Sequence, residues 1–352
     1  MRKLRHIAVC VLCAVGALLP VQFFGVTAAQ AVTFTNLTLL NGWTAGPFGT
    51  GKPSVAIIGG IVHFRGAIAT SGTNPEPFVL PASFRPATNV FVPVDMCNAT
   101  NGRLDIAPSG VVTVAQQDPG FADAQCFTSL DGASFAPSAT VFTGLTLQNG
   151  WTNAPFGTSN AAARNISGII HFKGAVASGT SAVLFTLPAS FRPAKDVYVP
   201  VDLCDATNGR LHITPSGVVD VEPEGGTFAN AQCFTSLDGA SFAKTATSFT
   251  ALTLKNGWTN APFGTSNAAV RNINGVIHFK GAIATGGTNP VPFTLPAAFR
   301  PANNVFVPVD LCNATNGRLD IAPSGVVSVE AEGGTFSNAQ CFTSLDGASF
   351  LP

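Results

Sequence analysis

The sequence predicts an all-β protein built from three tandem modules. The chain is 46% hydrophobic and only 10% charged, and its 36 Gly and 25 Pro divide the apolar stretches into short segments, as in all-β domains. The same motifs recur three times at a spacing of roughly 107 residues. No stretch after residue 31 shows a helical period of apolar positions. We therefore expect three antiparallel modules of the β-sandwich or jelly-roll type.

The first 31 residues have the pattern of a secretory signal. Basic residues at positions 2–5 precede an apolar run over residues 7–19, and Ala31 ends a small-x-small cleavage site. The apolar run is shorter than the roughly 20 residues that a spanning helix needs. We expect residues 1–31 to be a signal peptide, and the mature chain to be secreted and extracellular with no membrane segment.

Each module carries the same motifs in the same order. NGW opens a module, HFRG or HFKG, FRPA and NGRL follow, and QCFTSLDGASF closes it. These motifs predict a first β-module at 32–139, a second at 140–246 and a third at 247–352, with short joins between them. A repeat of this length is a domain rather than a solenoid unit.

Side-chain alternation and turn residues place the strands within a module. In residues 60–68, Ile61, His63 and Arg65 share one face, and the residues between them share the other. Residues 90–96 are apolar on both faces. Asn101-Gly102 is a strong hairpin signal and predicts a turn before a strand at 103–106. Further turns are expected at 108–110 and 131–132, so that a module has about seven or eight strands.

Two cysteines recur in every module at a constant separation of 29 residues. The pairs are Cys97 and Cys126, Cys204 and Cys233, and Cys312 and Cys341. Six cysteines allow 15 pairings, but the constant separation makes one bridge within each module the simplest. A zinc site is the alternative, yet no His recurs beside these cysteines, and two thiols alone do not make a tetrahedral site. Three disulfides indicate an oxidising compartment.

The motifs after His63 occur in an order known from another group of proteins. They read FxLPxxFRP at 78–86, GRLxIxPxGxV at 102–112 and SLDGxxF at 129–135. This order resembles the small β-modules at the tips of phage tail-fibre and minor tail proteins. The resemblance implies an all-β tip that trimerises and contacts a receptor, often a glycan, on a host surface. The export signal, the cysteine pairs and the fusion of three modules depart from that family and favour a secreted cellular protein that reuses the module.

The double-sided apolar strand at 90–96 bears on how the modules are arranged. One face can fill the core of its own module, while the other fills an axis shared with the other copies. Since modules of this type form trimers in the family that the sequence resembles, three fused copies are expected to pack with one another as an intramolecular pseudo-trimer. A linear row of beads is the alternative, and the short joins permit either arrangement.

One Trp and one pair of cationic side chains recur per module as candidate binding residues. The indoles, Trp43, Trp151 and Trp258, are either sugar-stacking platforms or core plugs, and a single Trp in a β-module is more often the latter. In each module a His and a basic residue two positions later share one face of a strand. They form either an anion-binding pair or a polar row on a half-buried strand, and we favour the polar row. These pairs are His63 with Arg65, His171 with Lys173, and His278 with Lys280.

Acidic residues raise the question of an enzyme or a metal site. Two Asp residues recur in each module, one near the end of the apolar strand and one in the Asp-Gly turn. They could form a glycosidase pair, but turn geometry alone explains the second Asp. These residues are Asp95, Asp202 and Asp310, and Asp131, Asp238 and Asp346. Asp95, Asn98 and Asn101 offer oxygen ligands for calcium without the spacing of an EF-hand loop. The second module has His212 where the first has Asp105, so this outward position is not fixed. We expect no catalytic residues, no metal and no cofactor.

The charge balance argues against two classes of partner. Lys and Arg together number 18, as do Asp and Glu, and three of the basic residues lie in the signal segment. Without clustered basic residues, neither nucleic acid nor an anionic membrane is an expected partner. We expect a secreted, non-enzymatic protein that binds a surface glycan or another extracellular macromolecule through its module loops. The alternative is a structural surface component whose modules pack only with each other, and a glycan-active enzyme is a third, weaker hypothesis.

Overall fold

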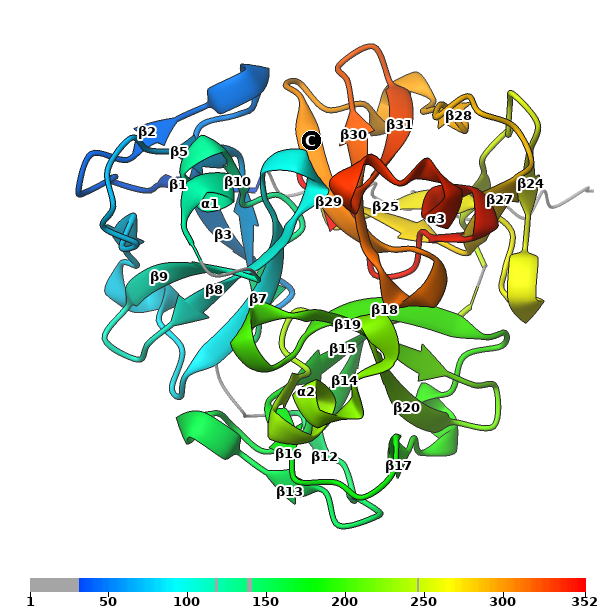
Figure 1. The fold of residues 1–352 in the computed structure, drawn as a ribbon, viewed down its shortest axis with the longest axis horizontal. Helices are drawn as coiled ribbons and strands as arrows, with labels where there is room; N and C mark the ends of the chain where they lie inside the picture. The colour runs from blue at the N-terminus through cyan, green and yellow to red at the C-terminus, as the bar shows by residue number, and fades with distance from the viewer. Residues whose placement is uncertain (1–31, 118–119, 138–140, 246) are drawn as a thin grey trace, which may run out of the picture. The chain divides into compact units, whose positions relative to one another are not determined.

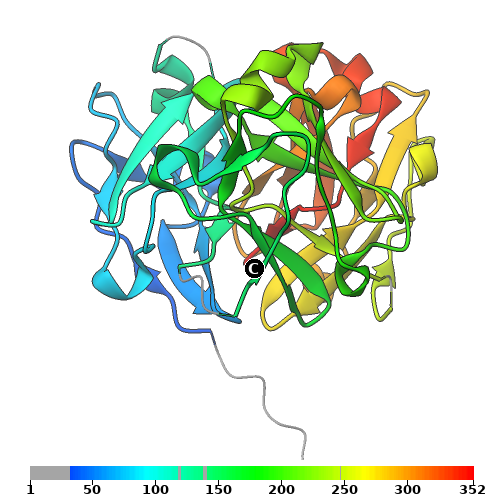
Figure 2. The ribbon, with the colours of Figure 1, turned by 90° about the horizontal axis from the view of Figure 1, so that it is seen from below.

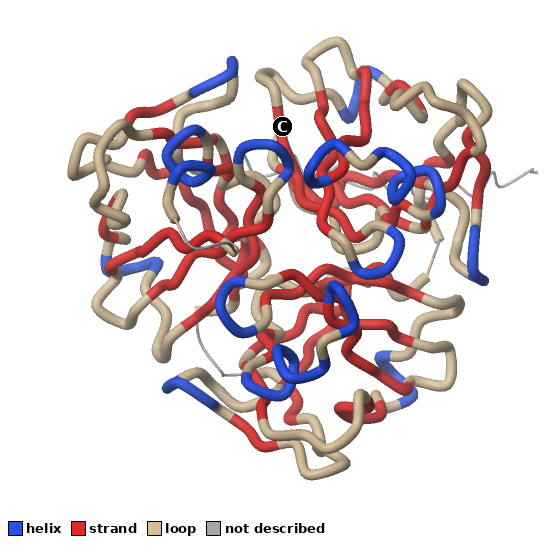
Figure 3. Tube along the Cα trace, viewed as in Figure 1, coloured by secondary structure: helices blue, strands red, loops and turns tan. Residues whose placement is uncertain are grey.

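The structure, a computed structural model, describes residues 32–117, 120–137, 141–245 and 247–352. The expected signal peptide at 1–31 lies outside the described residues, as do parts of the two joins. Residues Val32–Pro352 form one compact unit. Its strands pair in antiparallel sheets, and the helices among them are short (Figure 1, Figure 3). The predicted all-β class is therefore confirmed.

The first module contains three sheets, with strand orders β1-β3-β4-β11, β10-β5-β2 and β6-β9-β8-β7. Its elements are β1 (Thr35–Asn36), β2 (Thr44–Ala45), η1 (Pro47–Gly49), β3 (Ser54–Ile58), β4 (Ile61–Arg65), β5 (Ala67–Ala69), β6 (Phe78–Val79), η2 (Ala82–Phe84), β7 (Val90–Asp95), η3 (Cys97–Ala99), β8 (Asn101–Ile106), β9 (Val111–Gln116), α1 (Ala122–Cys126), β10 (Thr128–Ser129) and β11 (Ser134–Phe135).

The second module repeats these sheets as β12-β14-β15-β22, β13-β16-β21 and β17-β20-β19-β18. Its elements are β12 (Thr143–Gly144), β13 (Thr152–Asn153), η4 (Pro155–Gly157), β14 (Ala162–Ile166), β15 (Ile169–Lys173), β16 (Ala175–Ala177), β17 (Val183–Thr186), η5 (Ala189–Phe191), β18 (Val197–Asp202), η6 (Cys204–Ala206), β19 (Asn208–Ile213), β20 (Val218–Pro223), η7 (Glu224–Gly226), α2 (Phe228–Cys233), β21 (Thr235–Ser236) and β22 (Ser241–Ala243).

The third module has the orders β23-β25-β26-β33, β24-β27-β32 and β28-β31-β30-β29. Its elements are β23 (Thr250–Ala251), β24 (Trp258–Asn260), η8 (Pro262–Gly264), β25 (Ala269–Ile273), β26 (Val276–Lys280), β27 (Ala282–Thr285), β28 (Phe293–Thr294), η9 (Ala297–Phe299), β29 (Val305–Asp310), η10 (Cys312–Ala314), β30 (Asn316–Ile321), β31 (Val326–Ala331), η11 (Glu332–Gly334), α3 (Phe336–Cys341), β32 (Thr343–Ser344) and β33 (Ser349–Phe350).

Strand alternation fills a separate core in each module. In β4, Val62 and Phe64 are buried in the core of the first module, as the sequence predicts for their shared face. In β7, Val90, Val92 and Val94 enter the same core. The residues between them in β7 lie on the opposite face, which contacts other modules, as Phe91 contacts Phe234 of the second module.

The hairpin between β7 and β8 turns earlier than the sequence predicts. Asn101 and Gly102 do not form its turn, because both pair within β8, opposite Asp95 and Val94. The turn is made by η3, where Asn98 has φ 59°. A Cβ atom on Gly102 would overlap the side chain of Met96, so close packing rather than turn geometry requires this glycine.

The cysteines pair within each module, as expected. The bridges are Cys97–Cys126, Cys204–Cys233 and Cys312–Cys341. The bridges join η3 to α1, η6 to α2 and η10 to α3, and these three α-helices lie together at one end of the described unit (Figure 2). The helices have five or six residues, which is too short to show a period in the sequence.

The three modules meet through β7, β18 and β29, which contact one another pairwise (Figure 1). The contact between β29 and β7 joins the last module to the first. The modules therefore form a closed ring of three seams, which we call seam 1–2, seam 2–3 and seam 3–1 after the modules that they join. This is the arrangement expected of a pseudo-trimer within one chain.

Candidate functional site

Each seam contains the same set of polar contacts. An Asn side chain donates to the backbone of the next module, an Arg pairs with an Asp of that module, and a Ser of that module donates back to a backbone carbonyl. At seam 1–2 these are Asn101 to Ala206 O (2.7 Å), Arg103 to Asp202 (3.2 Å) and Ser236 to Phe91 O (2.6 Å). At seam 2–3 they are Asn208 to Ala314 O, Arg210 to Asp310 and Ser344 to Tyr198 O. At seam 3–1 they are Asn316 to Ala99 O, Arg318 to Asp95 and Ser129 to Phe306 O.

The carboxylates of these ion pairs are fully buried. The side chains of Asp95, Asp202 and Asp310 are 0% exposed. Burial raises the pKa of Asp310 to about 7, while the neighbouring Arg210 guanidinium lowers it. A buried carboxylate depends on its cation, because an unpaired buried charge is costly. The seams are therefore specific contacts that hold the modules in one register.

A pocket lies at each seam and is lined by aromatic rings of both modules. The pocket at seam 3–1 has a volume of about 320 Å³, and those at seams 1–2 and 2–3 about 160 Å³ each. The aromatic residues are Phe91, Phe156 and Phe234 at seam 1–2, Tyr198, Phe263 and Phe342 at seam 2–3, and Phe306, Phe48 and Phe127 at seam 3–1. Each pocket also contains the seam arginine and a cysteine of the local disulfide.

The rings in a pocket make successive edge-to-face contacts, from the exposed ring to the ring beside the seam arginine. At seam 1–2, the centroid of Phe156 lies 5.6 Å from that of Phe234, which lies 5.0 Å from that of Phe91. The Arg103 guanidinium carbon is 5.0 Å from the Phe91 centroid. The other seams repeat this order with nearly the same distances. Each pocket is thus complete only when two modules are in contact.

The outermost ring of each pocket is held exposed on a strained turn. Phe48, Phe156 and Phe263 are each 62% exposed. Their φ angles are 54°, 53° and 53°, in the left-handed region that residues with a Cβ seldom adopt. An exposed aromatic residue in a costly backbone conformation is more typical of a binding site than of a core.

The Trp residues lie in the module cores. Trp43, Trp151 and Trp258 are each 5% exposed and belong to the hydrophobic clusters. Each indole Nε1 donates to a backbone carbonyl, as Trp43 does to Asn74 O at 2.9 Å. A sugar-stacking platform needs an exposed ring face. This placement agrees with a core plug, and we do not include the indoles in the binding site.

The recurring His residues and both Lys residues are also buried, whereas Arg65 is partly exposed. His63, His171 and His278 are 6–7% exposed, and burial lowers the pKa of His63 to about 4 and that of His278 to about 3. The Lys173 Nζ donates to Ala136 O of the first module, and the Lys280 Nζ to Ala243 O of the second. Arg65 instead donates to Ser54 within its own module. The His and Lys residues are therefore packed within or between the modules. Arg65, by contrast, lines with Lys52 a pocket of about 350 Å³ whose other side is formed by residues of the third module.

The acidic residues considered as a glycosidase pair have separate structural partners. Asp95 pairs with Arg318 across seam 3–1, whereas the Asp131 carboxylate accepts a hydrogen bond from Gly66 N–H at 2.9 Å. Burial raises the pKa of Asp131 to about 7. Of the residues considered for calcium, Asn101 donates its side-chain amide to Ala206 O of the second module, and Asp95 pairs with Arg318 of the third.

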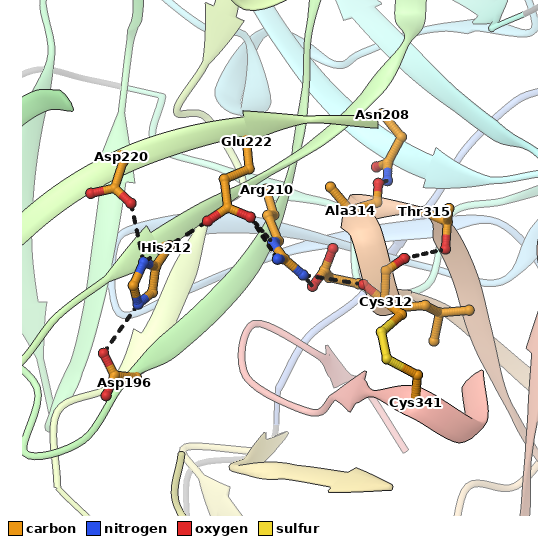
Figure 4. A network of polar contacts seen from close by, with 12 residues as sticks. Asp196, Asn208, Arg210, His212, Asp220, Glu222, Cys312, Ala314, Thr315 and Cys341 are labelled. Carbon is orange, nitrogen blue, oxygen red and sulfur yellow. Dashed lines mark hydrogen bonds and ion pairs between the residues drawn. A yellow bond between two sulfur atoms is a disulfide. The ribbon is translucent and has the colours of Figure 1, made fainter. Parts of the chain in front are cut away.

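The second module carries a polar cluster that the sequence analysis did not recognise as a site. His212 lies between Asp220, 3.1 Å from Nδ1, and Asp196, 3.1 Å from Nε2 (Figure 4). The hydrogen bond with Asp220 is the main cause of the raised pKa of His212. The replacement of Asp105 by His212 was visible in the sequence. Its partners, Asp220 on β20 and Asp196 just before β18, are brought to His212 only by the fold.

No family model, no curated protein and no solved structure matches this chain. Among the described residues, no helix combines the length and the apolar character that a membrane span requires. The three disulfides are typical of an oxidising, extracellular environment. The seams and their pockets are therefore the candidate functional site.

Proposed function

We propose that the protein is a secreted, non-enzymatic binding protein that recognises a surface glycan through its three seam pockets. The observation that carries the proposal is the exposed Phe on a strained turn, repeated at every seam beside an arginine. The tail-fibre resemblance supports the same function, since a receptor-binding tip is the role that it implies. The disulfides and the signal pattern of residues 1–31 support secretion.

The pocket chemistry fits a sugar ring. An exposed aromatic face offers apolar contact to the C–H face of a sugar, and an arginine beside it offers several N–H donors to hydroxyl or carboxylate groups. An Asn or Asp from the disulfide-linked turn completes each pocket, as Asn98, Asp205 or Asn313. A few polar groups around an apolar floor are the usual composition of a small-molecule site.

Threefold repetition supports recognition of a surface rather than of a single free molecule. Shallow pockets of this volume bind one sugar unit weakly. Three linked sites convert the second and third contacts into intramolecular events, which raises avidity by about 10²–10⁴ when the geometry permits simultaneous binding. A polymeric or densely displayed glycan is therefore the expected ligand.

A structural surface role is the second candidate, and the closed ring of seams favours it. In that case the modules serve only to pack with each other, and the exposed Phe residues contact neighbouring molecules of the same protein. Self-association that persists after these Phe residues are replaced would point to the structural role instead.

Replacing Phe48, Phe156 and Phe263 with Ala together is expected to abolish glycan binding while the fold is retained, because these side chains are mostly exposed. Binding of wild type and variant to a glycan array is the measurement, and single replacements are expected to lower avidity by at least about tenfold. Val79→Ala, at an exposed apolar residue outside the pockets, is the matched control. Equal binding by wild type and triple variant would contradict the proposal, as would an array without any ligand.

A further inference from the structure

The second module differs from the other two at one place in space. His212, Asp220, Asp196 and Tyr198 occupy positions that are Asp105, Thr113, Asn89 and Phe91 in the first module, and Asp320, Ser328, Asn304 and Phe306 in the third. Glu222, next to this cluster, is Ala115 in the first module and Glu330 in the third. The four changed side chains meet around one imidazole, so the changes define a single site.

Three of the donor atoms at this site converge. The Nδ1 atom of His212 lies 3.1 Å from Asp220 Oδ2 and 4.0 Å from Glu222 Oε1. Among the described residues, this is the group of three whose ligand atoms all lie within 4.8 Å of one another. Ligand atoms bound about 2.1 Å from a tetrahedral zinc ion lie about 3.4 Å apart. The observed separations bracket that value.

The surroundings hold these donors in the orientation that a metal ion needs. Asp196 lies 3.1 Å from Nε2, so its carboxylate can accept a hydrogen bond from Nε2–H. This favours the tautomer in which the lone pair of Nδ1 faces Asp220 and Glu222. Metal-binding histidines usually donate their other N–H to a carboxylate in this way. The ring of Tyr198 stacks on His212 with centroids 4.5 Å apart and planes 6° apart, which fixes the imidazole plane.

Glu222 is also fixed, by a contact on its other oxygen. The Arg210 guanidinium donates to Glu222 Oε2 at 2.6 and 2.8 Å and leaves Oε1 facing His212 (Figure 4). Side-chain exposures of 20% for His212, 22% for Asp220 and 39% for Glu222 leave room for water to complete the coordination. Two carboxylates and an imidazole nitrogen facing one point form a donor set that can bind a divalent cation.

We propose that His212, Asp220 and Glu222 bind a divalent transition-metal ion such as zinc. Asp196 and Arg210 are the positioning residues. Imidazole nitrogen with two carboxylates favours such an ion over calcium or magnesium, which prefer oxygen alone. The first and third modules lack this site, because their equivalent positions have no imidazole. It is independent of the glycan proposal, since zinc binding and glycan binding are measured separately.

Isothermal titration of the metal-free protein with Zn²⁺ tests the proposal. We expect one equivalent of zinc per chain in the wild type, and none in His212→Asp or Asp220→Ser, which introduce the residues that the third module tolerates at these positions. Asp196→Asn is expected to weaken binding by about 10–100-fold. Ser328→Ala, at the position of the third module that matches Asp220, is the control and leaves binding unchanged.

Either of two results would overturn the site. One is a wild-type protein that takes up no zinc, and the other is a His212→Asp variant that still binds one equivalent. Circular dichroism of each variant shows whether it is folded before titration, so a loss of binding is attributed to the site and not to the fold.

Discussion

Replacing Arg103 with Leu is expected to lower the free energy of unfolding by about 3–5 kcal/mol, because it leaves a buried carboxylate without its cation. Asp202 is fully buried, and its seam cation is Arg103, 3.2 Å away. Arg103 also donates to Leu203 O of the second module. The substitution therefore removes contacts that join the first module to the second. Chemical denaturation of wild type and variant measures it.

Two further variants separate the ion pair from other effects of the substitution. Arg103→Leu combined with Asp202→Leu removes both charges and is expected to recover most of the lost stability, because apolar groups can replace a buried pair. Arg271→Leu removes a guanidinium whose hydrogen bond to Thr247 O is exposed, and it is expected to change stability by less than about 0.5 kcal/mol. A loss below about 1 kcal/mol for Arg103→Leu alone would show that the seam does not depend on this pair.

Replacing Cys204 and Cys233 with Ala is expected to cost about 3–4 kcal/mol, the value for opening a loop of this length in the chain-entropy model. The two residues are 29 apart in sequence. Their bridge ties η6 to α2, and the next residue, Phe234, is the middle ring of the pocket at seam 1–2. The variant is therefore expected to bind glycan more weakly as well as to unfold more easily.

The same replacement elsewhere provides the comparison. Cys312→Ala with Cys341→Ala opens a loop of the same length and is expected to cost the same, while it disturbs the pocket at seam 2–3 instead. A loss well below about 1 kcal/mol in both variants would contradict the stabilising role of the bridges. If the two variants lost different amounts of unfolding free energy, the contacts at the seams, rather than loop entropy, would determine the contribution of each disulfide.

The sequence was most informative where a pattern is local. Alternation in β4 correctly separated Val62 and Phe64 from His63, and the constant cysteine separation correctly paired Cys97 with Cys126. The Asn101-Gly102 turn was wrong, because glycine serves close packing against Met96 as readily as it serves a turn. The short helices were missed because one turn of helix carries no period.

The pockets could not be predicted, because each is made by residues of two modules. Phe156 and Phe91 lie far apart in the chain, and nothing in the sequence places them at one seam. The recurring Pro-Phe-Gly sequence was the one indication of the pockets in the sequence, because an apolar side chain in a turn is not expected to be buried in a core. Likewise, the sequence predicts Arg103 to be an outward-facing charge on β8. Its partner Asp202 belongs to another module, and only the closed ring brings the two together.

Closure of the ring is the claim on which the pockets, the ion pairs and the proposed function all depend. Small-angle X-ray scattering of the protein in solution tests it most directly. A closed ring predicts a radius of gyration of about 20 Å, the value for one compact chain of this length. A linear row of three separate modules, each with a radius of gyration of about 13 Å, would give a value above about 25 Å and would contradict the account.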